Sequence, residues 1–521
     1  MIKERRRILK KFGACVGVAV LNPGFTCSAA QSSESLVPSK RSTAPNYWCT
    51  WAAQNYLYGQ NATELDLSKL EGPGGGQLAS SLLNEEVILG RRGWSEIVHQ
   101  RARDELYLLV DDGWEEGGSA TFELDRAKFR RFTGSAQDRL AGLNDAIRAR
   151  GWRSLALWCR GTPDGQGAAE RVRWTQGARI PYLKIDLGDD TGSLTRARTR
   201  QGAPLTLEHV HGESCLSGHW KEDGRFGAQP WGSARIEILR RTDVYRTYDA
   251  TAILGVPTTL DRATELLLGA SGHEEVDALL NVEDEVYIAA VLGCTMGVMR
   301  HSLRGLRPGA DADLFLPATR QLKQRMDEVV RAIRWQRIAP PYAVGEGFVA
   351  ADKRILTDEW LFRRGETFDT SVVGQRARQG APARVARNME LPGVSHDGEP
   401  PYVVCAKHPN GAAAIGTFER VSVREQVFQP NADVRWPLGG ARGPFGIFGR
   451  YRSLTLAHGP SVKVGRILAQ DLSGDSPVDV TDEVKRRPSE IVLSGQLIER
   501  IGLSNASPND HSMPGMVLVM S

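Results

Sequence analysis

The stretch PYLKIDLGDD at residues 181–190 decides the fold prediction for this chain. An apolar run from Ile180 to Ile185 contains one lysine, Lys184, and ends on Asp186, after which a polar segment with a glycine follows. This pattern is typical of a buried parallel strand that ends in a loop. Lys184 and Asp186 are two residues apart, so both side chains leave the strand on the same face. A cation keeps a neighbouring carboxylate ionised, and such a carboxylate can act as a nucleophile; a strand-end ion pair without a chemical role is the alternative.

Apolar runs of strand length alternate with helical patterns on both sides of this stretch. The expected strands cover residues 46–56, 105–110, 153–158, 180–186, 204–211, 234–239, 277–284 and 352–362. The expected helices cover residues 136–150, 168–176, 257–268, 287–300 and 318–337, and residues 57–103 form an insertion. Such alternation predicts a parallel α/β fold. Because acidic or aromatic residues follow strand after strand, and no Gly-rich nucleotide loop follows the first, we expect a (β/α)8 TIM barrel over residues 46–395.

The texture of the sequence changes after about residue 400. Short β-prone runs, such as residues 402–406, 413–418 and 489–494, are separated by Gly, Pro, Asn and Asp, and helical periodicity is absent. This pattern predicts a separate antiparallel β-sandwich over residues 400–521.

The first thirty residues predict an export signal. A basic segment at residues 4–10 precedes an apolar run at residues 12–21, which is too short to span a bilayer, and small residues follow at 27–30. The Arg-Arg pair followed by Ile-Leu-Lys resembles a twin-arginine signal, which exports folded proteins in bacteria; a basic N-terminus by chance is the alternative. We expect a Ser/Pro-rich linker at residues 31–45 and a periplasmic or secreted protein that is free of the membrane after cleavage.

Composition argues against several classes of partner. The 521 residues carry a formal net charge of only +4, which gives no electrostatic case for nucleic acid or for a membrane surface. The seven cysteines are scattered, with neither a CxxC motif nor metal-ligand spacing, so no disulfide framework is predicted, although a single bridge involving Cys49 stays open. No cofactor is expected, and no oligomeric state follows from the sequence.

Polar side chains gather at the ends of four expected strands. They are Asp111, Asp112 and Trp114; Lys184 and Asp186; Glu208 and His209; and Arg240 and Asp243. Because the carboxyl ends of barrel strands meet on one face, we expect these groups to lie together. Carboxylates accept hydrogen bonds from sugar hydroxyls, so the cluster suits a polyhydroxylated ligand such as an oligo- or polysaccharide. Two of the carboxylates would form a retaining glycosidase pair if they lay about 5 Å apart.

Several of these residues also carry a resemblance to a known group of enzymes. The runs LLVDDGW (108–114), LAGLNDAIRARG (140–151) and YLKID (182–186), in this order, resemble the barrel of the α-galactosidase clan, glycoside hydrolase families 27 and 36. The run GRILAQDLSGD (465–475) is similar to the closing β-domain of such enzymes. The resemblance implies a retaining exo-glycosidase that cleaves a terminal α-galactosyl-type residue without a metal or organic cofactor. α-N-Acetylgalactosamine and β-L-arabinopyranose are the neighbouring sugar choices.

The resemblance also implies roles for single residues. Asp186 is the expected nucleophile, and Lys184 is expected to hold sugar hydroxyls and to support the charge of Asp186. The implied sugar-binding positions are Trp51, Asp111, Asp112, Trp114, Trp158, Lys184, Glu208 and Arg240. Of these, Asp111 and Asp112 correspond to the groups near O4 and O6, Glu208 to a group near O2, and the tryptophans to walls of the sugar pocket.

The acid/base of the clan follows the sixth strand in an Arg-x-x-x-Asp setting, and two stretches of this chain compete for it. The spacing from Arg240 to Asp243 is one residue shorter than the clan pattern, and Arg246 and Asp249 form a second match. We favour Asp243 as the acid/base because it stands closest to the expected strand end at Leu239.

Two other functions fit parts of the pattern. A carbohydrate-binding barrel that has lost catalysis would keep the same polar strand ends. A metal-dependent hydrolase could be centred on Glu208, His209 and His211, because a His-x-His spacing places both imidazoles on one strand face.

Overall fold

The computed structural model describes most of the chain from residue 34 onward. The described residues are 34–54, 79–118, 121–161, 167–186, 191–210, 219–220, 226–227, 233–246, 256–301, 325–352, 354–355, 381–398, 400–421, 427–460 and 464–521. The expected signal segment lies outside them. Contacts divide the chain into two units, Met1–Ser33 and Glu34–Ser521, and all that follows concerns the second.

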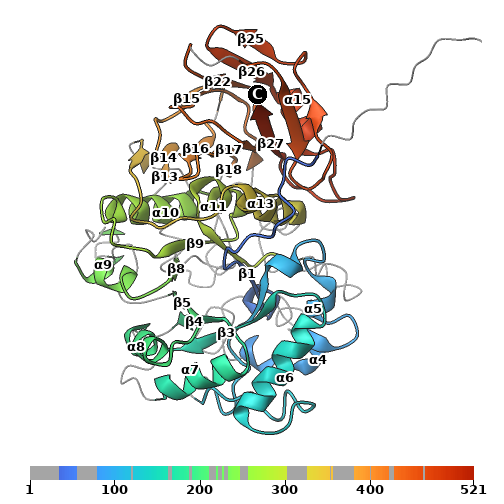
Figure 1. Ribbon diagram of the computed structural model, residues 1–521, viewed down its shortest axis with the longest axis vertical. Coiled ribbons are helices and arrows are strands. Elements are labelled where there is room, and N and C mark those ends of the chain that lie inside the picture. Colours follow the sequence, from blue (N-terminus) through green and yellow to red (C-terminus); the bar gives the residue numbers. More distant parts are fainter. Residues whose placement is uncertain are drawn as a thin grey trace, which may run out of the picture. The chain divides into compact units, whose positions relative to one another are not determined.

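Eight parallel strands close into a barrel (Figure 1). In chain order they are β1 (Tyr47–Cys49), β2 (Tyr107–Val110), β3 (Ser154–Arg160), β4 (Tyr182–Asp186), β5 (Thr206–His209), β8 (Val244–Arg246), β9 (Leu279–Glu283) and β10 (Thr295–Val298). Strand β10 closes the ring on β1 by pairing Gly297 with Tyr47. The predicted (β/α)8 architecture is therefore confirmed.

Alternation along each strand divides the side chains between the barrel interior and the surrounding layer. On β4, Leu183 and Ile185 join the core that the outer helices cover, whereas Tyr182 belongs to a separate cluster inside the barrel. Lys184 and Asp186 follow Tyr182 at steps of two, so they share its inward face. The strand thus has apolar residues outside and polar residues at its inner carboxyl end, as the opening stretch of sequence predicted.

Helices surround the barrel and connect its strands. They are α4 (Glu85–Leu89), α5 (Trp94–Ile97), the 3-10 turn η1 (Arg103–Glu105), α6 (Ala136–Arg148), α7 (Ala168–Gly177), α8 (Thr191–Gln201), α9 (Ser233–Leu239), α10 (Val256–Ala270), α11 (Val286–Leu292) and α13 (Met326–Ile338). Helix α6 begins with a capping box, in which the side chains of Ser135 and Asp138 each accept a hydrogen bond from the other residue's main-chain N–H. Such a cap contributes about 1 kcal/mol to helix stability, which fixes where the helix starts.

Two strand predictions are wrong. Residues 234–239 lie in helix α9, and the sixth barrel strand is β8, which begins only at Val244. The run Ala-Arg-Ile-Glu-Ile-Leu alternates between apolar and polar residues as a strand does, but in the structure Ile236 and Leu239 are buried on one face of a helix. A run of six residues is too short to distinguish the two-residue period of a strand from the 3.6-residue period of a helix. The eighth strand is β10, inside the expected helix 287–300, because Gly293 ends α11 in the left-handed conformation at φ 69°. Residues 356–362 of the expected last strand lie outside the described part.

The C-terminal region is a sandwich of two sheets that share one apolar core. The larger sheet contains, in order, β11 (Val349–Ala351), β14 (Arg384–Arg387), β16 (Tyr402–Lys407), β17 (Ala413–Phe418), β21 (Phe445–Phe448), β27 (Gly515–Met520), β23 (Ile467–Asp471) and β24 (Val478–Asp479). The smaller contains β15 (Gly393–His396), β20 (Ala432–Pro437), β22 (Ser453–Ala457), β26 (Glu490–Ser494) and β25 (Lys485–Arg487). Outside these sheets and the barrel lie the paired strands β6 (His219–Trp220) and β7 (Phe226–Gly227), β12 (Arg354–Ile355) and β13 (Ala381–Pro382), and β18 (Arg420–Val421) and β19 (Val427–Phe428), and helix α15 (Gly495–Gly502).

The sandwich prediction holds with two corrections. Strands β11, β14 and β15 precede residue 400, so the sheets begin before the expected boundary. The pairs β14–β16, β17–β21 and β20–β22 are parallel, so the sheets are mixed rather than antiparallel. The larger sheet is covered on both faces, by the smaller sheet and by helix α11, so a strand such as β16 is apolar almost throughout.

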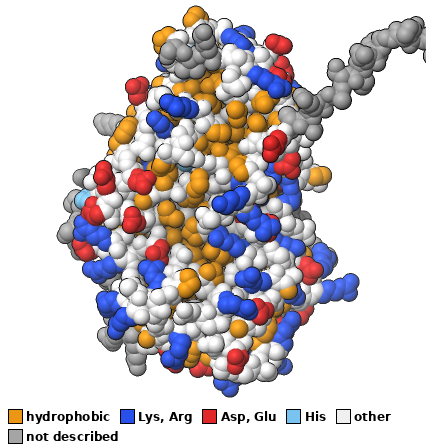
Figure 2. Space-filling view, in the orientation of Figure 1, with side chains coloured by type: hydrophobic (Ala, Val, Ile, Leu, Met, Phe, Trp, Pro, Cys, Tyr) orange, Lys and Arg blue, Asp and Glu red, His pale blue; other side chains and the backbone are white. Residues whose placement is uncertain are grey.

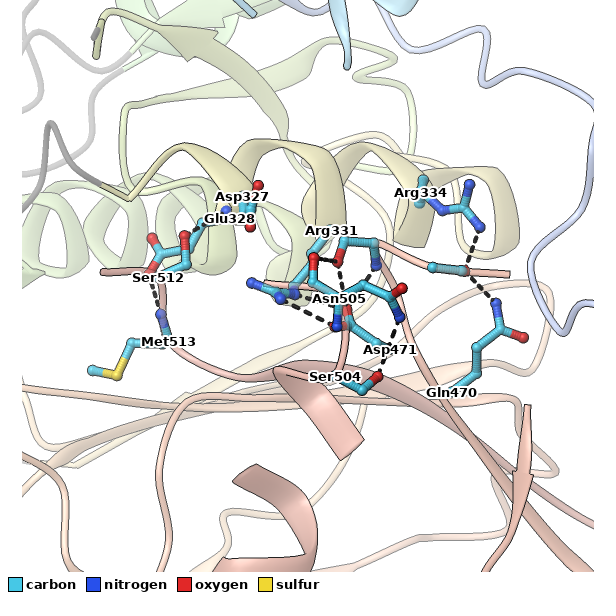
Figure 3. A network of polar contacts seen from close by, with 12 residues as sticks. Asp327, Glu328, Arg331, Arg334, Gln470, Asp471, Ser504, Asn505, Ser512 and Met513 are labelled. Atoms are coloured by element: carbon cyan, nitrogen blue, oxygen red, sulfur yellow. Dashed lines mark hydrogen bonds and ion pairs between the residues drawn. The ribbon is translucent and has the colours of Figure 1, made fainter. Parts of the chain in front are cut away.

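A buried polar network joins helix α13 to the sandwich (Figure 3). Arg331 of α13 donates two hydrogen bonds, of 2.9 and 3.1 Å, to the two carboxylate oxygens of Asp471 at the end of β23, and both side chains are fully buried. On the same helix, the carboxylate of Glu328 accepts a hydrogen bond from the main-chain N–H of Met513 at 2.9 Å. A bidentate Arg–carboxylate pair fixes orientation as well as distance, so the barrel and the sandwich are held in register by α13.

The expected linker before the barrel is in part ordered against both domains. The main-chain N–H of Leu36 donates to Gln470 of the sandwich at 2.7 Å, and that of Ser42 donates to Glu105 beneath the barrel at 2.8 Å. Val37 is buried in the main core. Residues 34–45 therefore act as a strap rather than as a free linker.

The surface carries both signs of charge. Figure 2 shows Lys and Arg side chains interspersed with Asp and Glu over the face in view, with apolar side chains between them. Exposed ion pairs such as Arg452 with Asp433 account for part of this mixing. Within the described ranges, the structure contains no helix with the length and apolarity to cross a bilayer.

Candidate functional site

The inner carboxyl end of the barrel holds three connected polar groups. The first is an ion pair between Lys184 of β4 and Asp111, which follows β2. The ammonium of Lys184 lies 2.7 Å from Asp111 Oδ2, and the Cys49 thiol donates to the same oxygen at 2.9 Å. Burial favours the neutral form of both charged groups, but their mutual attraction lowers the pKa of Asp111 and raises that of Lys184. Both groups are therefore charged at neutral pH.

The second group is Glu208 of β5, which is fully buried and accepts hydrogen bonds from three strands. The hydroxyl of Tyr47 donates to it at 2.9 Å, that of Tyr182 at 2.5 Å, and the side-chain amide of Asn281 at 2.7 Å. Burial raises the pKa of Glu208, against the opposing charge of Arg246 and the hydrogen bonds from the tyrosines. Glu208 is thus held in the barrel interior by side chains of three strands, and its contact with a sugar stays a prediction.

The third group is an ion pair between Arg246 and Glu283, the last residues of the neighbouring strands β8 and β9. Both side chains are buried, at 2% and 0% exposure. Burial disfavours the charged guanidinium, but the acidic groups around it, Tyr47, Glu208 and Asp186 among them, raise the pKa of Arg246 overall. This arginine therefore links the Glu208 cluster electrostatically to Asp186.

Asp186 closes β4 and is half-buried at the barrel end. The indole N–H of Trp158, on the neighbouring strand β3, donates to Asp186 Oδ2 at 3.2 Å. Trp51 and Trp158 belong to the same interior cluster. Lys184 forms its ion pair with Asp111, and the charge of Asp186 acts on Lys184 more weakly, so the expected support of Asp186 by Lys184 is a minor interaction.

Asp112 points to the insertion rather than to Lys184. Its carboxylate accepts a hydrogen bond from the Ser80 hydroxyl at 2.6 Å, and Gln54 donates to its main-chain carbonyl at 2.8 Å. Burial raises the pKa of Asp112. The insertion thus reaches the polar barrel end.

Trp114 does not wall this end of the barrel. It is fully buried in the outer core, where its ring packs edge-on against Phe122 at 5.3 Å between centroids. Its indole N–H donates to the main-chain carbonyl of Trp158 at 2.9 Å. The turn at Gly113, with φ at 108°, comes directly before it and can be adopted easily only by glycine. The structure therefore places Trp114 away from the expected sugar pocket.

Asp243 and Arg240 lie at the wrong end of their strand for the predicted chemistry. Because residues 234–239 form a helix, Asp243 precedes β8 and stands at its amino end. Its carboxylate pairs with Arg198 of α8 and accepts a hydrogen bond from the main-chain N–H of Leu207 at 2.7 Å. Arg240 is exposed and pairs with Glu237 and Glu275. The competing match, Asp249, lies outside the described residues.

The expected metal set is split between the two sides of the barrel wall. Glu208 faces inward, whereas its neighbour His209 is buried against the ring of Tyr245, which belongs to the outer core, at 5.5 Å between centroids. His211 lies outside the described residues. In the part of the chain that the structure covers, no three His, Cys, Asp or Glu side chains are placed to hold a metal ion. Cys49 is a free, buried thiol, so the single bridge that the sequence left open does not involve it.

Sequence reasoning gave the interior residues Tyr47, Cys49 and Tyr182 no place in the site, and it considered Arg246 only within the second acid/base match. It considered Asn281 and Glu283 only as strand-end residues that either touch substrate or cap the helix that follows. A signal for them existed. Each lies two residues from another inward-facing residue on its strand, as Tyr182 does from Lys184 and Asn281 from Glu283. Correct strand bounds followed by a step of two would have found them.

Comparison with known proteins identifies no family for this chain. No protein-family profile matches it, and no curated protein sequence does so. Among solved structures, a Bacillus halodurans protein to which α-N-acetylgalactosaminidase activity is ascribed has a TM-score of 0.34 and 10% identity over 94% of this chain and 99% of its own. An α-L-fucosidase of Bacteroides thetaiotaomicron has a TM-score of 0.34 and 11% identity over 93% and 98%. Likenesses of this size carry no argument about activity, and the fold described above rests on the chain's own strands.

Proposed function

We propose that this protein is an exported, retaining exo-glycoside hydrolase that removes a terminal α-galactosyl-type residue. The observation that carries the proposal is Asp186, a half-buried carboxylate at the carboxyl end of β4, oriented by the indole of Trp158 beside the Lys184–Asp111 pair. Active sites of such barrels lie at this end. The basic and short apolar segments at the N-terminus support export.

In the proposed reaction Asp186 attacks the anomeric carbon while an acid protonates the leaving oxygen. A covalent glycosyl-enzyme forms, and water activated by the same acid/base then releases the sugar with its configuration retained. The low pKa of Asp111 keeps that side chain ionised, so it can accept hydrogen bonds from sugar hydroxyls, and Trp51 and Trp158 supply apolar surface for the ring.

We assign the acid/base role to Asp249. The sequence places it three residues after Arg246, the last residue of β8, and so beyond the carboxyl end of the sixth barrel strand. Asp243, which precedes the strand, cannot reach the opposite barrel end.

The test is hydrolysis of p-nitrophenyl glycosides by the wild type and by Asp186→Asn. The panel contains the α-galactoside, α-N-acetylgalactosaminide, β-L-arabinopyranoside, α-glucoside and β-galactoside. We expect release from one of the first three, lost in the variant. Sugar binding without turnover by the wild type would instead indicate a carbohydrate-binding barrel, and activity that survives Asp186→Asn would contradict the nucleophile.

Azide separates the two catalytic roles. With Asp186→Ala, azide attacks in place of the carboxylate and gives a glycosyl azide of inverted configuration. With Asp249→Ala, azide attacks the glycosyl-enzyme and gives the azide of retained configuration. Product configuration by NMR therefore checks each role independently of the rate.

A further inference from the structure

The ion pair between Arg246 and Glu283 has hydrogen-bonding capacity left over. Nε of Arg246 and Oε1 of Glu283 are buried and have no hydrogen-bond partner among the residues that the structure describes. Within the pair, Nη2 of Arg246 donates to Oε2 of Glu283. A buried donor or acceptor without a partner is costly, and such atoms at a strand end call for an explanation.

The neighbouring polar groups differ from this pair. Both oxygens of the Glu208 carboxylate accept hydrogen bonds from the surrounding strands, and Lys184 is committed to Asp111. Nε of Arg246 and Oε1 of Glu283 thus offer hydrogen-bonding capacity at the two residues that end β8 and β9, which the carboxylate of Glu208 does not.

The spare atoms suit one kind of ligand group. One is an N–H donor and the other a carboxylate oxygen, and a hydroxyl both accepts and donates a hydrogen bond. The position lies at the same end of the barrel as Asp186, because Asp186, Arg246 and Glu283 are the last residues of β4, β8 and β9. A ligand with several hydroxyls, reaching Asp186, would bring one of them to this pair.

We propose that Glu283 contacts a hydroxyl of the sugar through Oε1 and, through Oε2, holds Arg246 so that its Nε donates to the same part of the sugar. Glu283 is thereby a specificity-determining residue. This inference rests on the proposed carbohydrate site and extends it to the carboxyl end of β9.

The test is a thermodynamic cycle that combines a change in the protein with the removal of one hydroxyl from the sugar, and titration calorimetry measures the affinity of each combination. D-Galactose, N-acetyl-D-galactosamine and L-arabinose are titrated into wild type and Glu283→Gln, followed by the monodeoxy derivatives of the sugar that binds. Loss of one charge-assisted hydrogen bond should weaken binding about 10- to 100-fold. For the derivative that lacks the contacted hydroxyl, wild type and variant should bind equally, since the contact is already absent.

The matched control is Asp471→Asn, which breaks an equally buried Arg–carboxylate pair outside the barrel interior. It should lower thermal stability and leave sugar affinity unchanged. If Glu283→Gln does not fold, as judged by circular dichroism, Glu283→Asp keeps the charge and withdraws Oε1, and it serves in the same cycle.

Each result decides the inference. If Glu283→Gln weakens the binding of every deoxy sugar equally, or does not weaken binding at all, the two unpartnered atoms bind water and the inference is wrong. It is also wrong if none of the three sugars binds. Because the readout is binding, the outcome is separate from hydrolysis. If one deoxy sugar removes the effect of Glu283→Gln but no substrate is hydrolysed, the hydroxyl contact stands and the proposed enzymatic activity is wrong. If a substrate is hydrolysed but no deoxy sugar removes the effect, the activity stands and the hydroxyl contact is wrong.

Discussion

Strand β8 has an arginine–carboxylate pair at each end, and the two pairs lie in different surroundings. At the amino end, Asp243 pairs with Arg198, and their side chains are 38% and 19% exposed. At the carboxyl end, Arg246 pairs with Glu283 at 2% and 0% exposure. The sequence around each end contains an Arg followed by an Asp, so the motif by itself does not say which end of the strand it marks. The direction of the strand decides, and the interior polar groups lie with Arg246.

The largest expected effect comes from removing the aspartate at each end of β8. Asp249→Asn should lower kcat by about 10²- to 10⁴-fold, the usual contribution of a positioned acid/base, whereas Asp243→Asn should leave kcat within about twofold. Steady-state kinetics on the best p-nitrophenyl substrate checks both variants. A large loss in Asp243→Asn with an intact fold would contradict the placement of the site at the carboxyl end.

The two ion pairs should also differ in stability. Glu283→Gln leaves a buried guanidinium without its counter-charge, which costs about 3–5 kcal/mol. Asp243→Asn breaks a partly exposed pair, worth about 0.2–1 kcal/mol, and keeps an oxygen for the Leu207 N–H. Urea unfolding of both variants measures the difference. Equal losses would mean that the interior pair is more solvated than its burial indicates.

The comparison shows what the sequence could and could not predict. The run around Asp186 is a strand of five residues with apolar outer positions, and its end, its inward face and its place in a barrel followed from alternation and from the polar loop after it. The segment at 234–239 has the same alternation in letters but buries Ile236 and Leu239 as a helix, and that choice depends on packing against residues distant in the chain. Because residues 234–239 were predicted as a strand, Asp243 was predicted to follow the sixth barrel strand, whereas in the structure it precedes that strand.

The sequence also could not predict which polar side chains pair with one another inside the barrel, for a related reason. Lys184 is two residues from Asp186, yet its ion pair is with Asp111, 73 residues earlier, because β2 and β4 lie on either side of β3 and their inward side chains meet over it. Glu208 likewise takes its hydrogen bonds from β1, β4 and β9. Local spacing predicts which side chains share a face, and it does not predict which of them meet across the interior.

Substitution of Gly297 on β10 tests how tightly the side chains around Glu208 are packed. A Cβ on Gly297 would lie 2.8 Å from both Asn281 Oδ1 and the Tyr47 hydroxyl, two groups of the Glu208 network. Gly297→Ala should therefore destabilise the protein by about 1–3 kcal/mol through overpacking. Gly202→Ala, at a position after α8 where nothing lies within 4 Å of the added Cβ, is a control for the methyl alone, although its φ of 59° adds local strain. Thermal unfolding compares them, and a neutral Gly297→Ala would show that the network can shift.

The smallest expected effect is on the pH dependence of stability, to which the buried carboxylate of Glu208 contributes. Burial raises the pKa of Glu208 in the folded protein above its unfolded value of about 4.3. Between the two values the folded state holds the proton more tightly than the unfolded state, so this residue's contribution to stability falls as pH rises from about 4.3 toward the folded pKa. Glu208→Gln does not ionise and removes this slope. The stability of the wild type relative to the variant should therefore decrease as pH rises from 5 to 8 in urea titrations. Two parallel pH profiles would mean that Glu208 is already ionised at pH 5, and that the hydrogen bonds from Tyr47, Tyr182 and Asn281, with the charge of Arg246, outweigh its burial.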